Sequence, residues 1–323
     1  MTGRGSHSRG FAVPEARGDA LPGRERQRPH LADASPRRGH EGAMAPAAAP
    51  AGMRIHKAMA RAGVASRREA ERMIEAGQVR VNGEDVRQPG RLLAPGDALE
   101  VSGRKVAWEE RPAPELWALY KPKRCVCTLN DPQGRRTVKD YFPRSAQRLF
   151  PVGRLDYDAE GLLLLTSDGA LAQRVMHPSF GVPRIYLVKV RGAVQPGTLR
   201  DLARGVELEG RLRQPARTRV LHKVNDKTWL EVVLKEGLQH HIKKMFQAVG
   251  HHVLKIKRYQ IGPIELGNLL PGQSRRLGQA DMERLTHWAE TGREGRAPRR
   301  RRSPGPGGAD DVPLLRVPAG ELA

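Results

Sequence analysis

The stretch GRLDYDAEGLLLLTSDG, residues 153–169, places three acids directly before four consecutive leucines. The leucines predict a buried strand. Asp156, Asp158 and Glu160 have the spacing of the first ligands of an EF-hand calcium loop, but the position that should carry glutamate is Ser167, and the strand fills the second half of that loop. A glycosidase pair of carboxylates is also disfavoured, because nothing else in the sequence resembles a sugar-binding groove. The three acids therefore lie in a turn, and the function of that turn has to be inferred from the rest of the chain.

Further strands and helices surround this stretch. β-Branched and aromatic residues predict strands at 115–120, 162–167, 185–192, 216–224 and 228–234. Apolar residues three and four apart predict helices at 171–177 and 241–250. Because these elements do not alternate in a βαβ rhythm, the sequence predicts an α+β fold with a mixed, largely antiparallel sheet.

A smaller unit precedes this one. Its first helix is indicated by apolar residues from Ile55 onward, and Ser66 with Glu69 forms a capping box that begins a second helix. Strands with an Asn-Gly turn follow, so we expect a helix-plus-hairpin domain. Arg67 and Arg68 stand in the first turn of the second helix, where free backbone amides and the helix dipole add to their attraction for phosphate.

Composition indicates the class of partner. The 323 residues include 57 Lys and Arg against 35 Asp and Glu, a formal net charge of +22, which favours a polyanion such as nucleic acid. No apolar run reaches the roughly 18 residues that span a bilayer, and the N-terminus lacks a secretory signal, so we expect a cytoplasmic protein that binds no membrane. Cys125 and Cys127 are too few for a structural zinc site, and we expect two small reduced core residues.

The chain divides by composition into five regions. Both ends are rich in Arg, Gly and Pro and lack apolar periodicity, so they cannot bury enough surface to offset chain entropy. We expect a disordered basic tail, the small domain, a linker, the large domain and a second disordered basic tail at 1–52, 53–103, 104–115, 116–290 and 291–323.

Several motifs resemble known families. The segment RIHKAMARAGVASRREAERMIEAGQVRVNGEDV resembles an S4 RNA-binding domain, whose helices lie on structured RNA. GRLD followed by GLLLLTSDG resembles the active-site stretch of pseudouridine synthases of the RsuA/RluB group. Three more stretches agree in order with that group: YKPKRCVCTLNDPQGRRTV, HPSFGVPRIYLVKVRG and KEGLQHHIKKMFQAVGHHV.

This resemblance implies roles for individual residues. Asp156 matches the catalytic aspartate, Tyr186 the active-site tyrosine, and Lys243 the basic residue that pairs with the aspartate. Ile242 matches the aliphatic residue before that cation, and Arg154 suits a phosphate or the space that a flipped base leaves. With Arg67 and Arg68 for RNA binding, these form the predicted site. The reaction implied needs no metal or redox cofactor.

The resemblance implies an isomerase that converts specific uridines of ribosomal RNA to pseudouridine. The stretch HPSFGVPRIYLVKV favours the RluB-like branch, which acts on the large subunit. The expected partner is ribosomal RNA or a ribosome-assembly intermediate, and the expected state is a monomer. The alternative is a non-catalytic S4-type RNA-binding or ribosome-assembly factor. The chain also departs from the family pattern, with His241 at a usual glutamine and Leu238, His240 and Lys244 at usual arginines.

Overall fold

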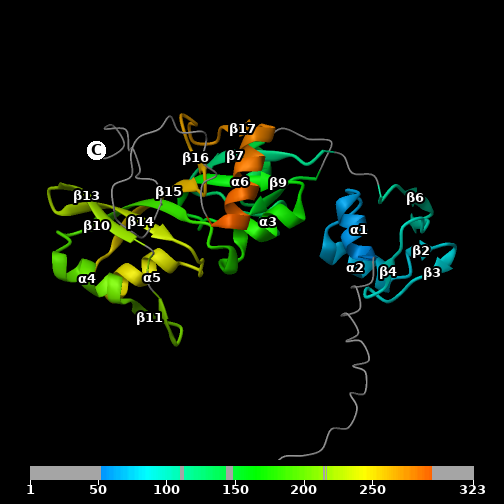
Figure 1. Cartoon of the computed structure of the whole chain (residues 1–323), viewed down its shortest axis with the longest axis horizontal. Helices are drawn as coiled ribbons and strands as arrows, with labels where there is room; N and C mark the ends of the chain where they lie inside the picture. Colours follow the sequence, from blue (N-terminus) through cyan, green and yellow to red (C-terminus); the bar gives the residue numbers. More distant parts are fainter. Residues whose placement is uncertain (1–51, 110–112, 143–147, 214, 216, 293–323) are drawn as a thin grey trace, which may run out of the picture. The chain divides into compact units, whose positions relative to one another are not determined.

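The computed structural model describes residues 52–109, 113–142, 148–213, 215 and 217–292 (Figure 1). Apart from Gly52, Thr291 and Gly292, the basic tails expected at the two ends lie outside these ranges. Within them, no helix combines the length and the apolar character that crossing a bilayer requires.

The N-terminal domain consists of two short helices and two small sheets. A two-stranded sheet pairs β1 with β4, and a four-stranded sheet has the order β3-β2-β5-β6. The elements are β1 (Met53–Arg54), α1 (Ile55–Arg61), α2 (Arg67–Glu75), β2 (Val79–Val81), β3 (Glu84–Asp85), β4 (Leu92–Leu93), β5 (Leu99–Val101) and β6 (Arg104–Val106).

Local signals explain these elements. The Ser66 hydroxyl accepts a hydrogen bond of 3.1 Å from the Glu69 backbone amide and so caps α2, while the Glu69 carboxylate binds Arg72. Asn82 and Gly83 both adopt positive φ, which suits a tight hairpin turn. The first residues of the expected linker belong to this domain, because β6 pairs with β5 and Trp108 packs into the core.

The C-terminal domain is built on a large sheet. In the described part of the chain its nine strands have the order β13-β14-β10-β15-β9-β7-β17, with β16 beside β15 and β8 beside β9. The strands are β7 (Leu116–Lys121), β8 (Phe150–Val152), β9 (Glu160–Thr166), β10 (Arg184–Arg191), β13 (Arg217–Val224), β14 (Lys227–Leu234), β15 (Val253–Ile261), β16 (Ile264–Glu265) and β17 (Ser274–Arg276).

Helices and a separate hairpin complete this domain. The helices are α3 (Gly169–Met176), α4 (Pro196–Arg204), α5 (His241–Ala248) and α6 (Gln279–Thr291), with short 3-10 turns η1 (Val138–Tyr141) and η2 (Pro178–Phe180). The hairpin joins β11 (Val206–Leu208) to β12 (Arg211–Arg213).

Two hydrophobic cores lie on the two faces of the sheet, and alternate side chains of β10 pack into one or the other. Ile185 and Leu187 face a core that includes α3 and α6, whereas Tyr186, Val188 and Val190 face a core that includes α4 and α5. Because successive side chains of a strand point to opposite faces, the two helix pairs cover opposite faces of the sheet (Figure 1).

These observations confirm the predicted α+β class and the largely antiparallel sheet. The five predicted strands and two predicted helices are present, with ends that differ by one or two residues. The sequence reasoning did not identify β15, α4 or α6. β15 is rich in Lys, Arg and Gln although it lies inside the sheet, so its composition is not typical of a buried strand.

A short parallel contact joins the two halves of the sheet. β9 and β15 pair only through Glu160 with Lys257 and Gly161 with Arg258, while the other strand pairs of the sheet are antiparallel. Gly161 has a φ of +110°, and a Cβ there would lie 2.2 Å from the backbone oxygen of Arg258. Glycine is therefore required for both the backbone conformation and the close approach of the two strands.

We expect Gly161→Ala to destabilise the domain by about 3 kcal/mol or more, because the added methyl group meets backbone that cannot move freely. The matched control is Gly169→Ala at the start of α3, where a Cβ meets nothing within 4 Å. Alanine is the better helix former, so this control should be neutral or slightly stabilising. Urea unfolding of both variants measures the difference, and equal stabilities would show that the strands can separate without cost.

Candidate active site

The acidic turn before β9 is anchored by the residues around Asp156. Leu155 and Ala159 are buried and belong to the same hydrophobic core as Tyr186 and Ile242. The Asp156 side chain is 26% exposed. Burial of its neighbours thus fixes the turn, while the carboxylate remains at the surface where a ligand can reach it.

A row of residues across the sheet lies beside this turn. Tyr186 of β10 is opposite Arg258 of β15, Arg258 is opposite Gly161 of β9, and Gly161 is opposite Lys121 of β7. Gly161 contributes no side chain to this row. The strands therefore carry an aromatic residue and two cations to the place where the two halves of the sheet meet.

Lys121 supports the turn from within the protein. Its side chain is fully buried, and its ammonium group donates hydrogen bonds to the backbone oxygens of Pro122, Asp156 and Ala159 at 3.0, 3.0 and 2.7 Å. Burial lowers the pKa of Lys121, while the negative charge of Asp156 acts in the opposite direction. Lys121 thus stabilises the turn by binding the backbone carbonyl groups of the turn.

The segment after Lys121 holds the same turn through other groups. The Cys127 sulfur lies 3.3 Å from the Leu155 backbone nitrogen and 3.4 Å from its oxygen, so the thiol can accept and donate at one residue. The Arg124 amide donates to the Tyr157 oxygen at 2.7 Å. Both cysteines are free thiols, and burial raises the pKa of Cys125 to about 11.

Arg258 fills the gap between the separating strands. It is 2% exposed, and its Nε donates to the Leu162 oxygen at 2.7 Å while Nη1 donates to the Arg154 oxygen at 3.3 Å. A buried guanidinium therefore satisfies backbone groups on both sides of the acidic turn. Its Nη2 is buried and makes no hydrogen bond to the described residues.

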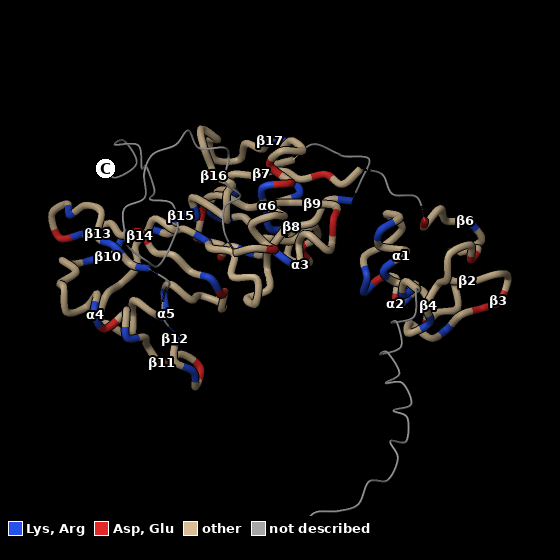
Figure 2. The backbone as a smooth tube through the Cα atoms, in the orientation of Figure 1, with Lys and Arg blue, Asp and Glu red and all other residues tan. Residues whose placement is uncertain are grey.

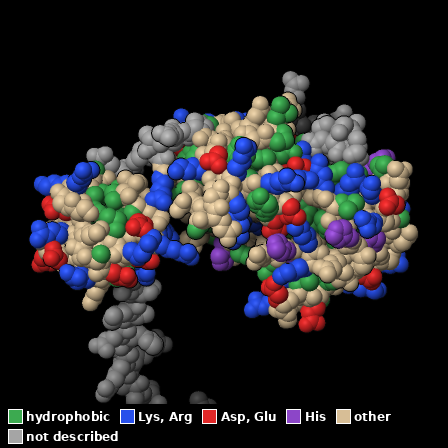
Figure 3. All heavy atoms as spheres, turned by 180° about the vertical axis from the view of Figure 1, so that it is seen from behind, with side chains coloured by type: hydrophobic (Ala, Val, Ile, Leu, Met, Phe, Trp, Pro, Cys, Tyr) green, Lys and Arg blue, Asp and Glu red, His purple; other side chains and the backbone are tan. Residues whose placement is uncertain are grey.

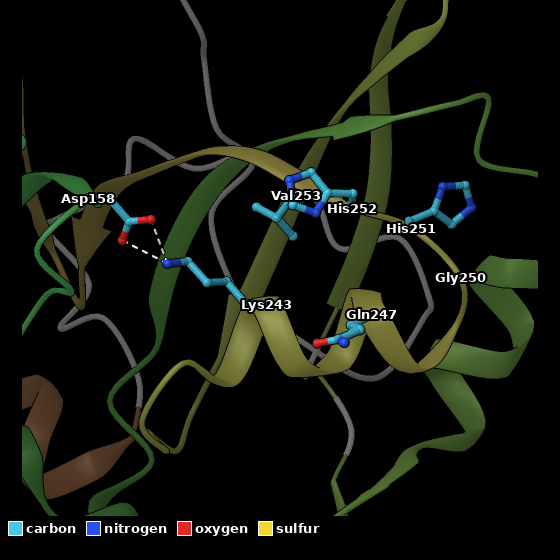
Figure 4. Close-up of a pocket in the computed structure, with 7 residues that line it drawn as sticks. All are labelled: Asp158, Lys243, Gln247, Gly250, His251, His252 and Val253. Carbon is cyan, nitrogen blue, oxygen red and sulfur yellow. Dashed lines mark hydrogen bonds and ion pairs between the residues drawn. The ribbon is translucent and has the colours of Figure 1, made fainter.

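The structure contradicts the predicted pairing of Lys243 with Asp156. Lys243, on the first turns of α5, binds both oxygens of Asp158 at 2.7 and 2.6 Å (Figure 4). Burial acts to raise the pKa of Asp158, but the hydrogen bond and charge of Lys243 lower it below its ordinary value. Asp158 is the more exposed of the two acids, so the flexible lysine reaches it at the surface of the turn.

His240 and His241 lie at the start of α5, at two of the positions where the chain departs from the family pattern that it resembles. His240 precedes the helix with a φ of +57°, and its Nε2 lies 3.7 Å from the Asp156 carboxylate. His241 is 4% exposed, and neither ring nitrogen has a hydrogen-bond partner among the described residues. Burial lowers the pKa of His241, which favours the neutral imidazole.

The fold brings together only part of the predicted site. Tyr186 and Ile242 lie in one hydrophobic core with Leu155, the residue before Asp156, and Lys243 binds Asp158, two residues after it. Arg154 is exposed in the turn. The sequence reasoning missed Lys121, Arg258 and the contact made by Cys127. The available signals were the Lys-Pro pair at the end of a strand and an Arg within a segment of strand-like alternation.

The remaining predicted residues lie on the N-terminal domain. Arg67 and Arg68 are exposed at the start of α2, and basic residues recur along α1 and α2 (Figure 2). On the C-terminal domain, Lys and Arg side chains spread over the face shown in Figure 3, with histidines among them. Across the described ranges, no three His, Cys, Asp or Glu side chains are grouped so that they could hold a metal ion.

Comparison with known proteins agrees with the division into a small N-terminal domain and a larger C-terminal domain. Residues 115–248 match the RNA pseudouridylate synthase family, and residues 53–99 match the S4 domain. A solved structure described as a pseudouridylate synthase superimposes with a TM-score of 0.52 at 28% sequence identity, over 72% of this chain and 99% of that chain.

Two relatives cover most of the chain. Ribosomal large subunit pseudouridine synthase B of Bacillus subtilis is 39% identical over 242 residues, which are 74% of this chain and 98% of that protein. The protein of the same name from Escherichia coli O6:H1 is 40% identical over 227 residues, which are 68% of this chain and 76% of that protein. The chain therefore belongs to the RNA pseudouridine synthase family and carries an S4 RNA-binding domain before its synthase domain.

Proposed function

We propose that this protein isomerises a uridine of large-subunit ribosomal RNA to pseudouridine, with Asp156 as the reacting carboxylate. The observation that carries the proposal is the acidic turn: its backbone oxygens bind the buried Lys121, its Asp156 side chain stays 26% exposed, and Leu155 packs in the core that contains Tyr186. Relatives that cover most of this chain bear the name of large-subunit synthases, which supports the choice of RNA. We also propose that it works in the cytoplasm and acts as a monomer.

The reaction explains why a carboxylate is needed. The bond between N1 and the sugar breaks, the base turns, a bond forms between C5 and the sugar, and the C5 proton is lost while N1 gains one. An ionised carboxylate can attack or assist at the sugar or at the ring. The target base has to leave its stack to reach it. Tyr186 is 8% exposed in the structure, and in this reaction it would stack on the base and relay the C5 proton through its hydroxyl.

Basic side chains lie around the turn that carries Asp156. Lys121 lies buried below the turn, and His240 lies beside the carboxylate. Lys243 neutralises Asp158, so this second acid does not add an unpaired negative charge next to the first. Lys121 and His240 therefore contact Asp156, where the family resemblance indicated Lys243 alone.

The test that separates an enzyme from a non-catalytic RNA-binding factor is tritium release from RNA that contains 5-tritiated uridine. Large-subunit RNA should release tritium with the purified protein, and small-subunit RNA should not. Mapping of pseudouridines in ribosomal RNA from a strain that lacks the gene then names the position. Release from neither RNA would favour the assembly-factor alternative.

We expect Asp156→Asn to reduce turnover by more than about 10³-fold, because the amide cannot act as the carboxylate does. RNA affinity should change little, since phosphate contacts elsewhere supply most of it. Tritium release and filter binding measure the two quantities. Substantial turnover by this variant, free of wild-type enzyme, would show that another group does the chemistry.

Lys121→Met should leave the backbone oxygens of Asp156 and Ala159 without their buried donor and let the turn shift. We expect the single-turnover rate to fall by about 10²-fold, together with a lower melting temperature, because small displacements of a reacting group are costly. The exposed Lys123→Met is the matched control and should behave like the wild type. Equal rates for the two variants would mean that the turn holds its shape without Lys121.

The double substitution Arg67→Glu and Arg68→Glu should weaken binding to the natural RNA and flatten its salt dependence. Each lost phosphate contact lowers the slope of log K against log salt by about 0.7–0.9. The single-turnover rate at saturating RNA should be preserved. Affinity measured from low to moderate salt decides the matter, and an unchanged slope would make these arginines ordinary solvated residues.

A further inference from the structure

A second site lies next to the proposed uridine site. A pocket with a volume of about 590 Å³ opens between α5 and the start of β15 (Figure 4). This volume is in the range of pockets that bind small organic groups. Neither Asp156 nor Tyr186 lines it. Its lining residues are Asp158, Lys243, Gln247, Gly250, His251, His252 and Val253.

The ion pair between Lys243 and Asp158 places this pocket beside the reacting carboxylate. Asp158 belongs to the same turn as Asp156, and Lys243 directly follows Ile242, which shares a core with Tyr186. The pair therefore stands between the proposed uridine site and the pocket. An RNA strand whose uridine reaches Asp156 brings its neighbouring nucleotides towards this place.

The chemistry of the lining favours an uncharged group. Lys243 and Asp158 are the two formal charges of the lining, and they neutralise each other at 2.6 Å. A phosphate would need a surplus of positive charge there. The other polar side chains are the Gln247 amide and two imidazoles, which can donate and accept hydrogen bonds. A planar nucleobase, with donors and acceptors on its edge and apolar faces, matches this lining.

The positions of these side chains suit a base that enters from the surface. Gln247 is exposed and lies one helical turn after Lys243, so both point from the same side of α5 (Figure 4). His252 and Val253 lie across from the helix at the start of β15. His251 is held by a contact of 2.9 Å between its Nδ1 and the Arg191 oxygen.

We propose that this pocket binds an unpaired base of the RNA strand adjacent to the target uridine, with Gln247 at the base edge and His252 at its face. This inference rests on the proposed function. The pocket thereby selects which uridine is presented to Asp156, since only a sequence that can extrude both bases fills both sites. Base recognition of this kind is typical of single-stranded RNA segments.

The test combines protein variants with RNAs that lack one base. Full-length protein acts in single turnover on a large-subunit RNA fragment that holds 5-tritiated uridine at the target and one abasic position among its neighbours. Gln247→Ala and His252→Ala are compared with Lys244→Ala, a control on the same helix whose ammonium binds Glu209 outside the pocket. For each combination of protein variant and RNA, we measure the RNA concentration that gives the half-maximal rate and the rate at saturating RNA. Melting temperatures verify that each variant is folded.

We expect Gln247→Ala to raise the half-saturating concentration about tenfold on intact RNA while the saturated rate stays within about twofold. One abasic position should produce the same loss with the wild type and no further loss with Gln247→Ala, which is the signature of direct contact. Independent losses at every abasic position, or an equal effect of Lys244→Ala, would overturn the pocket proposal alone. No tritium release by the wild type would overturn the proposed function and the pocket together.

Discussion

The two residue pairs that join β9 to β15 are the contact on which the C-terminal domain depends. Each half of the sheet is antiparallel, and Gly161 is the residue that lets the halves approach closely enough to pair. Apart from these two pairs, β9 and β15 are not paired with each other. The sheet is therefore open beside the turn that carries Asp156, just before β9. A site within an otherwise continuous sheet thus arises from the shortness of one parallel contact.

Opening a sheet leaves backbone groups without their usual partners, and buried cations satisfy them here. Arg258 binds the Leu162 oxygen, and Lys121 binds the oxygens of Asp156 and Ala159. Neutral side chains could satisfy one or two such groups, but an ammonium or guanidinium offers several donors from one point. The Lys121 ammonium also interacts electrostatically with Asp156. The same group therefore supplies a structural and an electrostatic contact.

The sequence predicts the outline of the fold better than the contacts of the site. Strands such as β9 and β10 carry a clear apolar signal, and the Ser66 cap and the Asn82-Gly83 turn act over a few residues. β15 could not be predicted, because its charged side chains are buried only by residues that are distant in the sequence. The partner of Lys243 could not be derived, because adjacent acids in one turn differ only in how the folded turn presents them. The sequence around Lys121 also does not distinguish it from a solvated surface lysine, although the fold buries it fully.

The order in which the chain is synthesised gives the seam between β9 and β15 another consequence. Arg258 and the Leu162 oxygen that it binds are 96 residues apart. A nascent chain that has emerged only as far as β14 has the acidic turn and the tyrosine strand but lacks the strand that belongs between them. Such contacts of long sequence separation form late, since the loop between them must first be closed. The backbone around Asp156 therefore acquires its contacts with Arg258 only after almost the whole domain has left the ribosome.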